Sequence, residues 1–338
     1  MSPTHSAERV GLFALTAALV ACAARPPVSA PNGWLPMTRE QRCSQLFATM
    51  RGGARLLRTN VAQLRFVELG PGALGGATPV TGVVNAGLEP RFSPRGSASS
   101  EPTPWLFVHG LGGGLGDFAP VLMLAAREHH VFAVDLPGFG GSVSLEADYS
   151  IHAHVRALRS FAAAIGVERF HLVCHSLGGQ VCLALALEAP AMVASLTLVD
   201  AAGTYDQADF LEEKTGGALG VLRPSHDPAI YAITGGDMEI VDRLLSGDPF
   251  VLSAIASFKE SYRGRLRDLS VPTLIVWGAA DPLLPLRYGV HMKENIAGSR
   301  LRVVPNAQHW PQLSHPSVVF DAIVALHRDL VPRSLETP

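Results

Sequence analysis

Cysteine is scarce in this chain, with four residues in 338. A chain of this length can bury a large apolar core without covalent cross-links, so we expect no dependence on disulfides. An excess of one charge is also missing, because 27 Lys and Arg stand against 29 Asp and Glu. This balance argues against nucleic acid or another polyanion as a partner.

A long membrane-spanning apolar run is missing as well. The uninterrupted apolar or small-residue stretch near the N-terminus, residues 10–21, is only about a dozen residues long, which is short for a membrane span. It follows a polar start with the single basic residue Arg9, as in a secretory signal. We therefore predict a signal peptide over residues 1–21.

The end of this signal, Leu19-Val20-Ala21-Cys22, resembles the lipobox of bacterial lipoproteins. In such proteins the cysteine is lipidated and becomes the new N-terminus, so Cys22 is the predicted lipidation site. Residues 22–37 then form a proline-rich tether between the lipid and the domain. The protein is expected in the bacterial cell envelope, at the outer membrane or facing the periplasm, with the membrane as its partner through the N-terminal lipid. Cleavage around residues 21–23 with simple secretion, and an uncleaved anchor, are the alternatives.

Nucleotide-binding signatures are absent. Residues 110–116 are glycine-rich and follow an apolar run, but they lack the Lys-Ser/Thr of a phosphate loop and the acidic partner of a dinucleotide site. His152 and His154 face different directions on a predicted helix, which disfavours a metal site. We expect no cofactor and no metal.

Short β-type runs alternate with helical stretches from Gln63 onward. This pattern predicts an α/β fold with a mostly parallel sheet and helices on both faces. Residues 38–202 and 269–338 form the predicted core. Residues 203–268 are too long for a plain crossover, and their helical patterning predicts an inserted helical cap.

A serine stands at the centre of the segment Cys174-His175-Ser176-Leu177-Gly178-Gly179, which joins the apolar run 170–173 to the Ala/Leu-rich run 181–189. A sharp strand-to-helix turn lifts such a hydroxyl above the sheet edge. The first N–H groups of the helix and the positive end of its dipole then point at the group under attack. Ser176 is therefore a candidate nucleophile.

A serine nucleophile needs a histidine base, a carboxylate and an oxyanion site. Polar groups follow three further apolar runs: His109 after 105–108, Asp281 after 274–277, and His309 after 301–304. Open parallel sheets place their chemistry at the carboxyl ends of the strands. The order Ser176, Asp281, His309 is the one expected for this architecture.

Over about residues 60 to 330 the chain resembles the α/β-hydrolase family. The matching motifs are His109-Gly110, Asp135-Leu136-Pro137-Gly138-Phe139-Gly140, His175-Ser176-Leu177-Gly178-Gly179, Gly278-Ala279-Ala280-Asp281-Pro282 and His309-Trp310-Pro311-Gln312-Leu313-Ser314-His315-Pro316. The resemblance implies Ser176 as nucleophile, His309 as base and Asp281 as its partner. It also implies an oxyanion hole formed by the backbone N–H groups of Leu111 and Leu177.

Cys174 departs from the family pattern, which usually has glycine there. As a strand residue it is a poor candidate for the nucleophile, because a buried cysteine behaves as a small apolar side chain. Beside Cys22, the residues Cys43, Cys174 and Cys182 remain. We expect free buried thiols, because a strand and its following helix should keep Cys174 and Cys182 apart.

The predicted function is that of a serine hydrolase that cleaves a small apolar carboxylic ester through an acyl-enzyme. A carbon–carbon bond hydrolase or an acyltransferase of the same fold is the alternative, as is a non-catalytic envelope lipoprotein. Asp200, at the end of the run 196–199, competes with Asp281 as the acid that orients His309. The sequence does not specify an oligomeric state.

Overall fold

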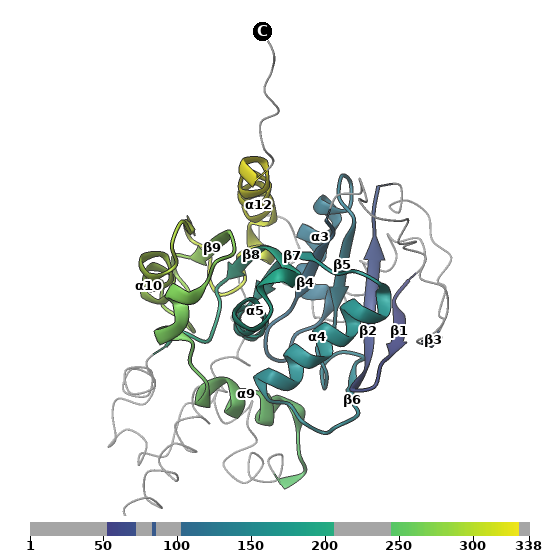
Figure 1. Ribbon diagram of the computed structural model, residues 1–338. Coiled ribbons are helices and arrows are strands. Elements are labelled where there is room, and N and C mark those ends of the chain that lie inside the picture. Colours follow the sequence, from purple (N-terminus) through teal and green to yellow (C-terminus); the bar gives the residue numbers. More distant parts are fainter. Residues whose placement is uncertain (1–52, 72–82, 86–102, 206–244, 331–338) are drawn as a thin grey trace, which may run out of the picture.

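The computed structural model describes residues 53–71, 83–85, 103–205 and 245–330 (Figure 1). The predicted signal peptide, Cys22, the tether and Cys43 lie outside these residues, as does the greater part of the predicted cap. Among the described residues, no helix combines the length and apolar character required to cross a membrane.

The described strands form a single sheet in the order β10-β9-β8-β7-β4-β5-β2-β1-β3, with β6 paired to β2. From β10 to β5 every neighbouring pair is parallel, whereas β2 is antiparallel to β5, β1 and β6. The strands are β1 Arg55–Arg58, β2 Ala62–Leu69, β3 Val83–Asn85, β4 Trp105–Val108, β5 Val131–Val134, β6 Val143–Ser144, β7 Phe170–His175, β8 Val193–Val199, β9 Thr273–Gly278 and β10 Arg300–Val304.

Three of the parallel strands are buried along their whole length because both faces of the sheet are covered. Every residue of β4, β5 and β9 is buried. By contrast, β2 alternates buried and half-buried residues over its first half, as a strand near the side of a sheet does. Continuous burial therefore distinguishes these parallel strands from β2.

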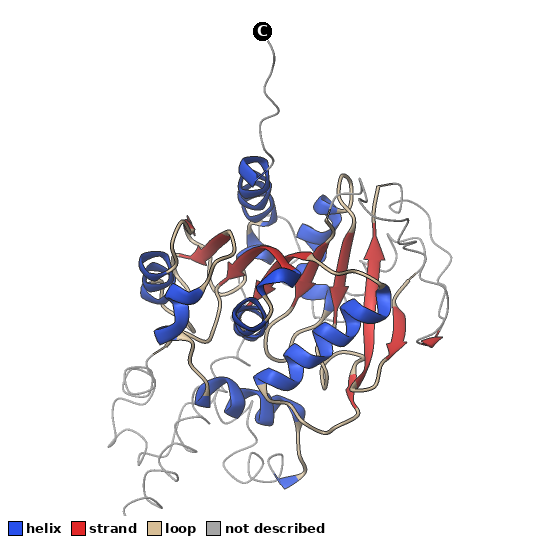
Figure 2. Cartoon of the chain, in the orientation of Figure 1, coloured by secondary structure: helices blue, strands red, loops and turns tan. Residues whose placement is uncertain are grey.

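Helices pack on both faces of the sheet (Figure 2). On one face α3 (Ala119–Ala125) and α12 (Pro316–Leu330) share a core with Val173 and Val276, while α4 (Ile151–Ile165), α5 (Leu177–Glu188) and α10 (Arg287–Asn295) contribute to the core of the other face. The short helical segments are η1 Leu115–Phe118, η2 Pro190–Met192, η3 Arg263–Asp268 and α11 Pro311–Ser314. The predicted fold class is confirmed.

Helix α4 shows how local sequence sets an element's bounds. The Ser150 hydroxyl accepts the N–H of Ala153 at 3.1 Å and caps the N-terminus. Gly166 ends the helix with φ at 70°, a left-handed conformation that glycine adopts without strain. A side-chain cap and a terminal glycine thus set the two ends of this helix.

Helix α9 (Pro249–Lys259) lies between β8 and β9 in the chain, inside the segment predicted as a cap. The Gln180 amide of α5 donates to the carbonyls of Ser257 and Glu260 at 3.1 and 2.7 Å. On the same helix, Ser253 Oγ lies 3.1 Å from His154 Nε2 of α4. The assignment of residues 203–268 to a separate cap stays a prediction.

The prediction of free thiols is wrong for one pair, because Cys174 and Cys182 form a disulfide. Cys174 lies on β7 and Cys182 on α5, and both are completely buried. Helix α5 turns back over the sheet directly after the elbow, which brings the two Cα atoms to 6.5 Å, within the range that a disulfide spans. The turn that the sequence analysis predicts to separate the cysteines instead brings them together.

Candidate active site

Ser176 occupies the turn between β7 and α5 in a backbone conformation that is rare for a side-chain-bearing residue. Its φ and ψ are 50° and −118°. Such conformations cost about 1–3 kcal/mol and persist only where the surroundings fix them. Here the Ser176 N–H donates to the Val199 carbonyl at 3.1 Å, and the Ser176 carbonyl accepts the N–H of Ala202 at 3.0 Å. The hydroxyl is thus held at the carboxyl edge of the sheet.

Two glycines allow the elbow to pack closely against the loop that follows β4. A Cβ atom on Gly178 would lie 2.4 Å from the His109 carbonyl oxygen, and one on Gly110 would lie 2.9 Å from the Ser176 Cβ. Leu111 follows Gly110 directly, and Leu177 is the first residue of α5, where an N–H has no partner within the helix. The two predicted oxyanion residues thus flank the point where loop and elbow meet, and their role stays a prediction.

His309, in the loop between β10 and α11, bridges Ser176 and Asp281. Its Nε2 lies 3.0 Å from Ser176 Oγ and its Nδ1 lies 2.7 Å from Asp281 Oδ2. With a neutral imidazole, the Nδ1–H donates to Asp281 and the Ser176 hydroxyl donates to Nε2, an assignment that follows from the hydrogen-bond network. This arrangement can move a proton from the hydroxyl to the imidazole.

Asp281 lies in the turn after β9, and both oxygens of its carboxylate accept hydrogen bonds. Oδ1 accepts the N–H groups of Leu283 and Leu284 at 2.7 and 3.0 Å, while Oδ2 accepts from His309. Burial alone would raise the pKa of Asp281, but the charge and hydrogen bond of His309 and these two backbone bonds lower it below its ordinary value. Asp281 is therefore ionised at neutral pH.

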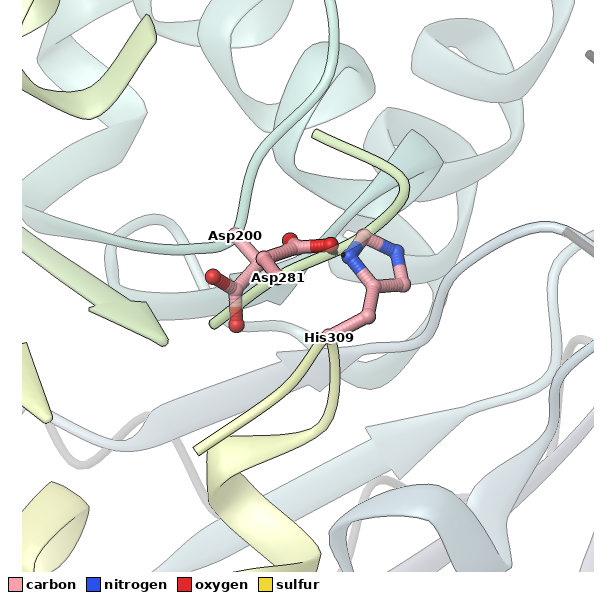
Figure 3. Close-up of side chains that lie close together, drawn as sticks. All are labelled: Asp200, Asp281 and His309. Atoms are coloured by element: carbon pink, nitrogen blue, oxygen red, sulfur yellow. Dashed lines mark hydrogen bonds and ion pairs between the residues drawn. The ribbon is translucent and has the colours of Figure 1, made fainter. Parts of the chain in front are cut away.

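Asp200, the competing acid, lies beside this pair without taking its place. Figure 3 shows the side chains of Asp200, Asp281 and His309 close together. One carboxylate oxygen of each aspartate and a ring nitrogen of His309 lie within 4.8 Å of one another. Asp200 Oδ1 accepts the N–H of Gly278 at 2.8 Å. Among the described residues, these three are the group whose composition suits a metal, but His309 Nδ1 and Asp281 Oδ2 are already bonded to each other.

His175 holds the loop that carries His309, a role that the sequence analysis did not assign to it. Its Nε2–H donates to the carbonyl oxygen of His309 at 2.7 Å. Burial, followed by the charge of His309, lowers the pKa of His175 to about 3, so the ring is neutral. The signal that could have identified this role was the placement of His175 one residue before the elbow serine, on a strand that ends at the site.

Apolar side chains from α9 cover the loop that contains Leu111. Leu111 and Phe250 pack together with Ala254, Ile255 and Phe258 of α9. A Cβ atom on Gly112 would lie 2.9 Å from the Phe250 ring, which shows how closely the helix approaches this loop. One side of the site is thus apolar.

His152, His154 and His315 make contacts with other parts of the protein. His152 is exposed and pairs with Glu188 and Glu260, whereas His154 is buried against Ser253. The His315 carbonyl accepts the N–H of Val319 at the start of α12. The two members of the His152/His154 pair therefore do not converge on one point.

The comparisons with known proteins concern the family and the fold. A family model described as "Alpha/beta hydrolase family" matches residues 105–322. A 2-hydroxy-6-oxononadienedioate/2-hydroxy-6-oxononatrienedioate hydrolase of Paraburkholderia phymatum is 27% identical over 259 residues, which cover 69% of this chain and 89% of that protein.

Two solved structures share the fold at low identity. A thermophilic esterase from Thermogutta terrifontis matches with a TM-score of 0.58 and 20% identity, covering 82% of this chain and 99% of that one. A meta-cleavage product hydrolase from Pseudomonas fluorescens IP01 matches with a TM-score of 0.54 and 19% identity, covering 83% and 98%.

Proposed function

Because this chain belongs to the alpha/beta hydrolase family, we propose that it is a serine hydrolase that cleaves a carboxylic ester through an acyl-enzyme. The observation that carries the proposal is the hydrogen-bonded series of Ser176, His309 and Asp281 at distances of 3.0 and 2.7 Å. The buried, ionised carboxylate of Asp281 stabilises the imidazolium, so that His309 can accept a proton.

In the first half of the reaction, Ser176 Oγ attacks the ester carbonyl carbon while its proton passes to His309 Nε2. Asp281 stabilises the imidazolium, and the developing oxyanion accepts the N–H groups of Leu111 and Leu177. The carbon–oxygen bond then breaks, and His309 donates its proton to the departing alcohol. In the second half, water attacks the acyl-enzyme by the same steps, which releases the acid and restores Ser176.

The packing around Leu111 supports an apolar acyl or alcohol group in the substrate. Leu111 and Phe250 share an apolar cluster with Ala254 at the loop beside Ser176. The Paraburkholderia relative is named for a substrate that carries two carboxylates. That relationship favours carbon–carbon bond hydrolysis as the second candidate function. This reaction would require the chain to bind a doubly charged substrate beside an apolar wall.

Covalent labelling followed by substrate profiling tests the proposal. A fluorophosphonate probe should label the protein at Ser176, and p-nitrophenyl esters should be turned over. A protein that is labelled and cleaves a ring-fission dienedioate but no ester would be a carbon–carbon bond hydrolase. Labelling with turnover only when an alcohol acceptor is added would indicate an acyltransferase, and the absence of labelling would indicate a non-catalytic protein.

We propose further that the mature protein is attached to the bacterial envelope by a lipid on Cys22. The lipobox-like end of the signal supports this, as does the Cys174–Cys182 disulfide, because disulfides persist in oxidising compartments such as the periplasm. Several acyl chains bind far more firmly than one, at about 0.8 kcal/mol per buried methylene. The protein should therefore fractionate with membranes and Cys22→Ser should not, whereas equal solubility of both would contradict the anchor.

A further inference from the structure

Asp200 is a carboxyl group for which the proposed reaction has assigned no role. It follows β8 with φ at 40°, in the left-handed region that non-glycine residues rarely adopt, and its side chain is fully buried. Its backbone N–H donates to the Val276 carbonyl at 3.0 Å. Strained backbone of this kind often accompanies a functional site.

The hydrogen bonds of Asp200 are too few for a buried carboxylate ion. Oδ1 accepts one N–H, that of Gly278, and Oδ2 has no hydrogen-bond partner of ordinary geometry among the described residues. By comparison, the Asp281 carboxylate accepts three N–H groups. A buried ion with one donor would pay a large desolvation cost.

The titratable groups close to Asp200 make ionisation still less favourable. Asp281 and His309 lie within 4.8 Å, and Asp281 already carries the negative charge that pairs with His309. Burial, and after it the charge of Asp281, raises the pKa of Asp200 well above its ordinary value. Two adjacent carboxyl groups in such a site share one proton and titrate as a pair.

We propose that Asp200 is a positioning residue that stays protonated through the reaction. Its side-chain oxygen Oδ1 accepts the N–H of Gly278, and its carboxylic O–H donates to the Asp281 carboxylate. The inference rests on the proposed serine hydrolase function. The pair then carries one negative charge, which matches the single positive charge of the imidazolium. Gly278 ends β9 just before the turn that carries Asp281. The bond from the Gly278 N–H to Asp200 Oδ1 therefore also fixes where that turn begins.

Two substitutions separate the protonated acid from an ion and from a merely structural side chain. Asp200→Asn keeps an oxygen for the Gly278 N–H and an N–H donor for Asp281, at the charge of the protonated acid. Asp200→Gly removes both groups while it tolerates the positive φ. The measurements are kcat, KM and the acidic limb of the pH dependence of kcat/KM, which reports protonation of the essential base of the free enzyme.

Asp200→Asn should keep kcat within about threefold and leave the acidic limb within about 0.3 pH unit, because the charge near His309 does not change. Asp200→Gly should lower kcat by about tenfold or more with little change in KM and move the acidic limb to higher pH, because Asp281 becomes more basic without its donor. A fall of the acidic limb by about one pH unit in Asp200→Asn would mean that a negative charge had been removed, which would overturn the proposal. An unchanged kcat and an unchanged pH profile in Asp200→Gly would reduce Asp200 to a structural residue.

An infrared difference spectrum between the wild type and Asp200→Asn gives a readout that needs no turnover. At neutral pH the wild type should show the carbonyl stretch of one protonated carboxylic acid that the variant lacks. A carboxylate band in its place would refute the protonated state even in an active enzyme. If the protein hydrolyses no ester yet shows the protonated band, the proposed function fails while the protonation of Asp200 stands.

Discussion

A buried serine hydroxyl lies beside a histidine at each end of the strand pair β7 and β8. At the carboxyl end, Ser176 Oγ lies 3.0 Å from His309 Nε2, and at the amino end, Ser195 Oγ lies 3.0 Å from His327 Nε2. Ser195 is part of β8 and His327 belongs to α12. The same contact thus occurs twice in one sheet, and only one end has the other parts of a hydrolase site.

The difference lies in what surrounds each pair. The Ser195 hydroxyl is also 2.8 Å from Nδ1 of His171, so two imidazoles share it, and the rings of His171 and His327 lie 4.0 Å apart. Burial, followed by other cationic groups, lowers the pKa of His171 to about 4 and that of His327 to about 3. At the carboxyl end, by contrast, the Asp281 carboxylate pairs with the imidazole of His309. A serine and a histidine at hydrogen-bond distance are therefore insufficient, because the imidazole must be able to hold a proton.

The sharpest way to test this comparison is to remove each hydroxyl in turn. Ser176→Ala should lower kcat by about 10⁶-fold, the scale seen when a triad serine is removed from another serine hydrolase. Ser195→Ala is the matched control and should leave kcat within about twofold, since its hydroxyl contacts no part of the site. Ester hydrolysis with circular dichroism on both proteins decides the matter, and comparable losses in the two variants would mean that the assignment is wrong.

The carboxylate is the next feature to remove. Asp281→Asn should lower kcat by about 10⁴-fold without loss of fold, because the amide favours the wrong tautomer of His309 and cannot stabilise the imidazolium. The comparison variant is Asp200→Asn, for which most activity should persist. A large loss in the Asp200 variant alone would reverse the roles of the two acids.

The smallest predicted effect is on the stability of the fold at acidic pH. It involves the two histidines at the amino ends of β7 and β8. His171 and His327 have folded-state pKa values of about 4 and about 3, below the unfolded value near 6.5. Their contribution to stability is therefore fully present above about pH 6.5 and is lost as the pH falls towards the folded values, by up to about 1.4 kcal/mol per pH unit for each site.

Urea unfolding at pH 7.5 and pH 5 tests this expectation. The His171→Gln/His327→Gln variant should lose less stability between the two pH values than the wild type does. Some loss will persist, because burial also lowers the pKa of His154 and His175 to about 3. Equal losses in the two proteins would show that the amino-end histidines do not titrate on unfolding.

The placement of polar residues after apolar strands indicated which side chains lie at one edge of the sheet. Parallel strands bring their carboxyl ends to that edge, so Ser176, Asp281 and His309 could be expected there from the positions of β7, β9 and β10. Asp200 follows β8 and meets the same condition, and only the family resemblance favoured Asp281 as the acid. The Cys174–Cys182 bridge was missed, because it depends on the angle at which α5 leaves the elbow. The hydrogen bond of His175 and the surroundings of Asp200 were missed as well, because they depend on which buried groups find a partner, and spacing carries no such information.

The Cys174–Cys182 bridge also bears on the order in which the site is assembled. The two cysteines are only 8 positions apart, whereas Ser176 and His309 are separated by 133. Under the proposed export, the elbow can be closed covalently while β9 and β10 have yet to emerge. Contacts between near neighbours in sequence form before distant ones, since less chain entropy is lost. Ser176 is then already set in its turn, and Asp281 and His309 reach it when the last strands join the sheet.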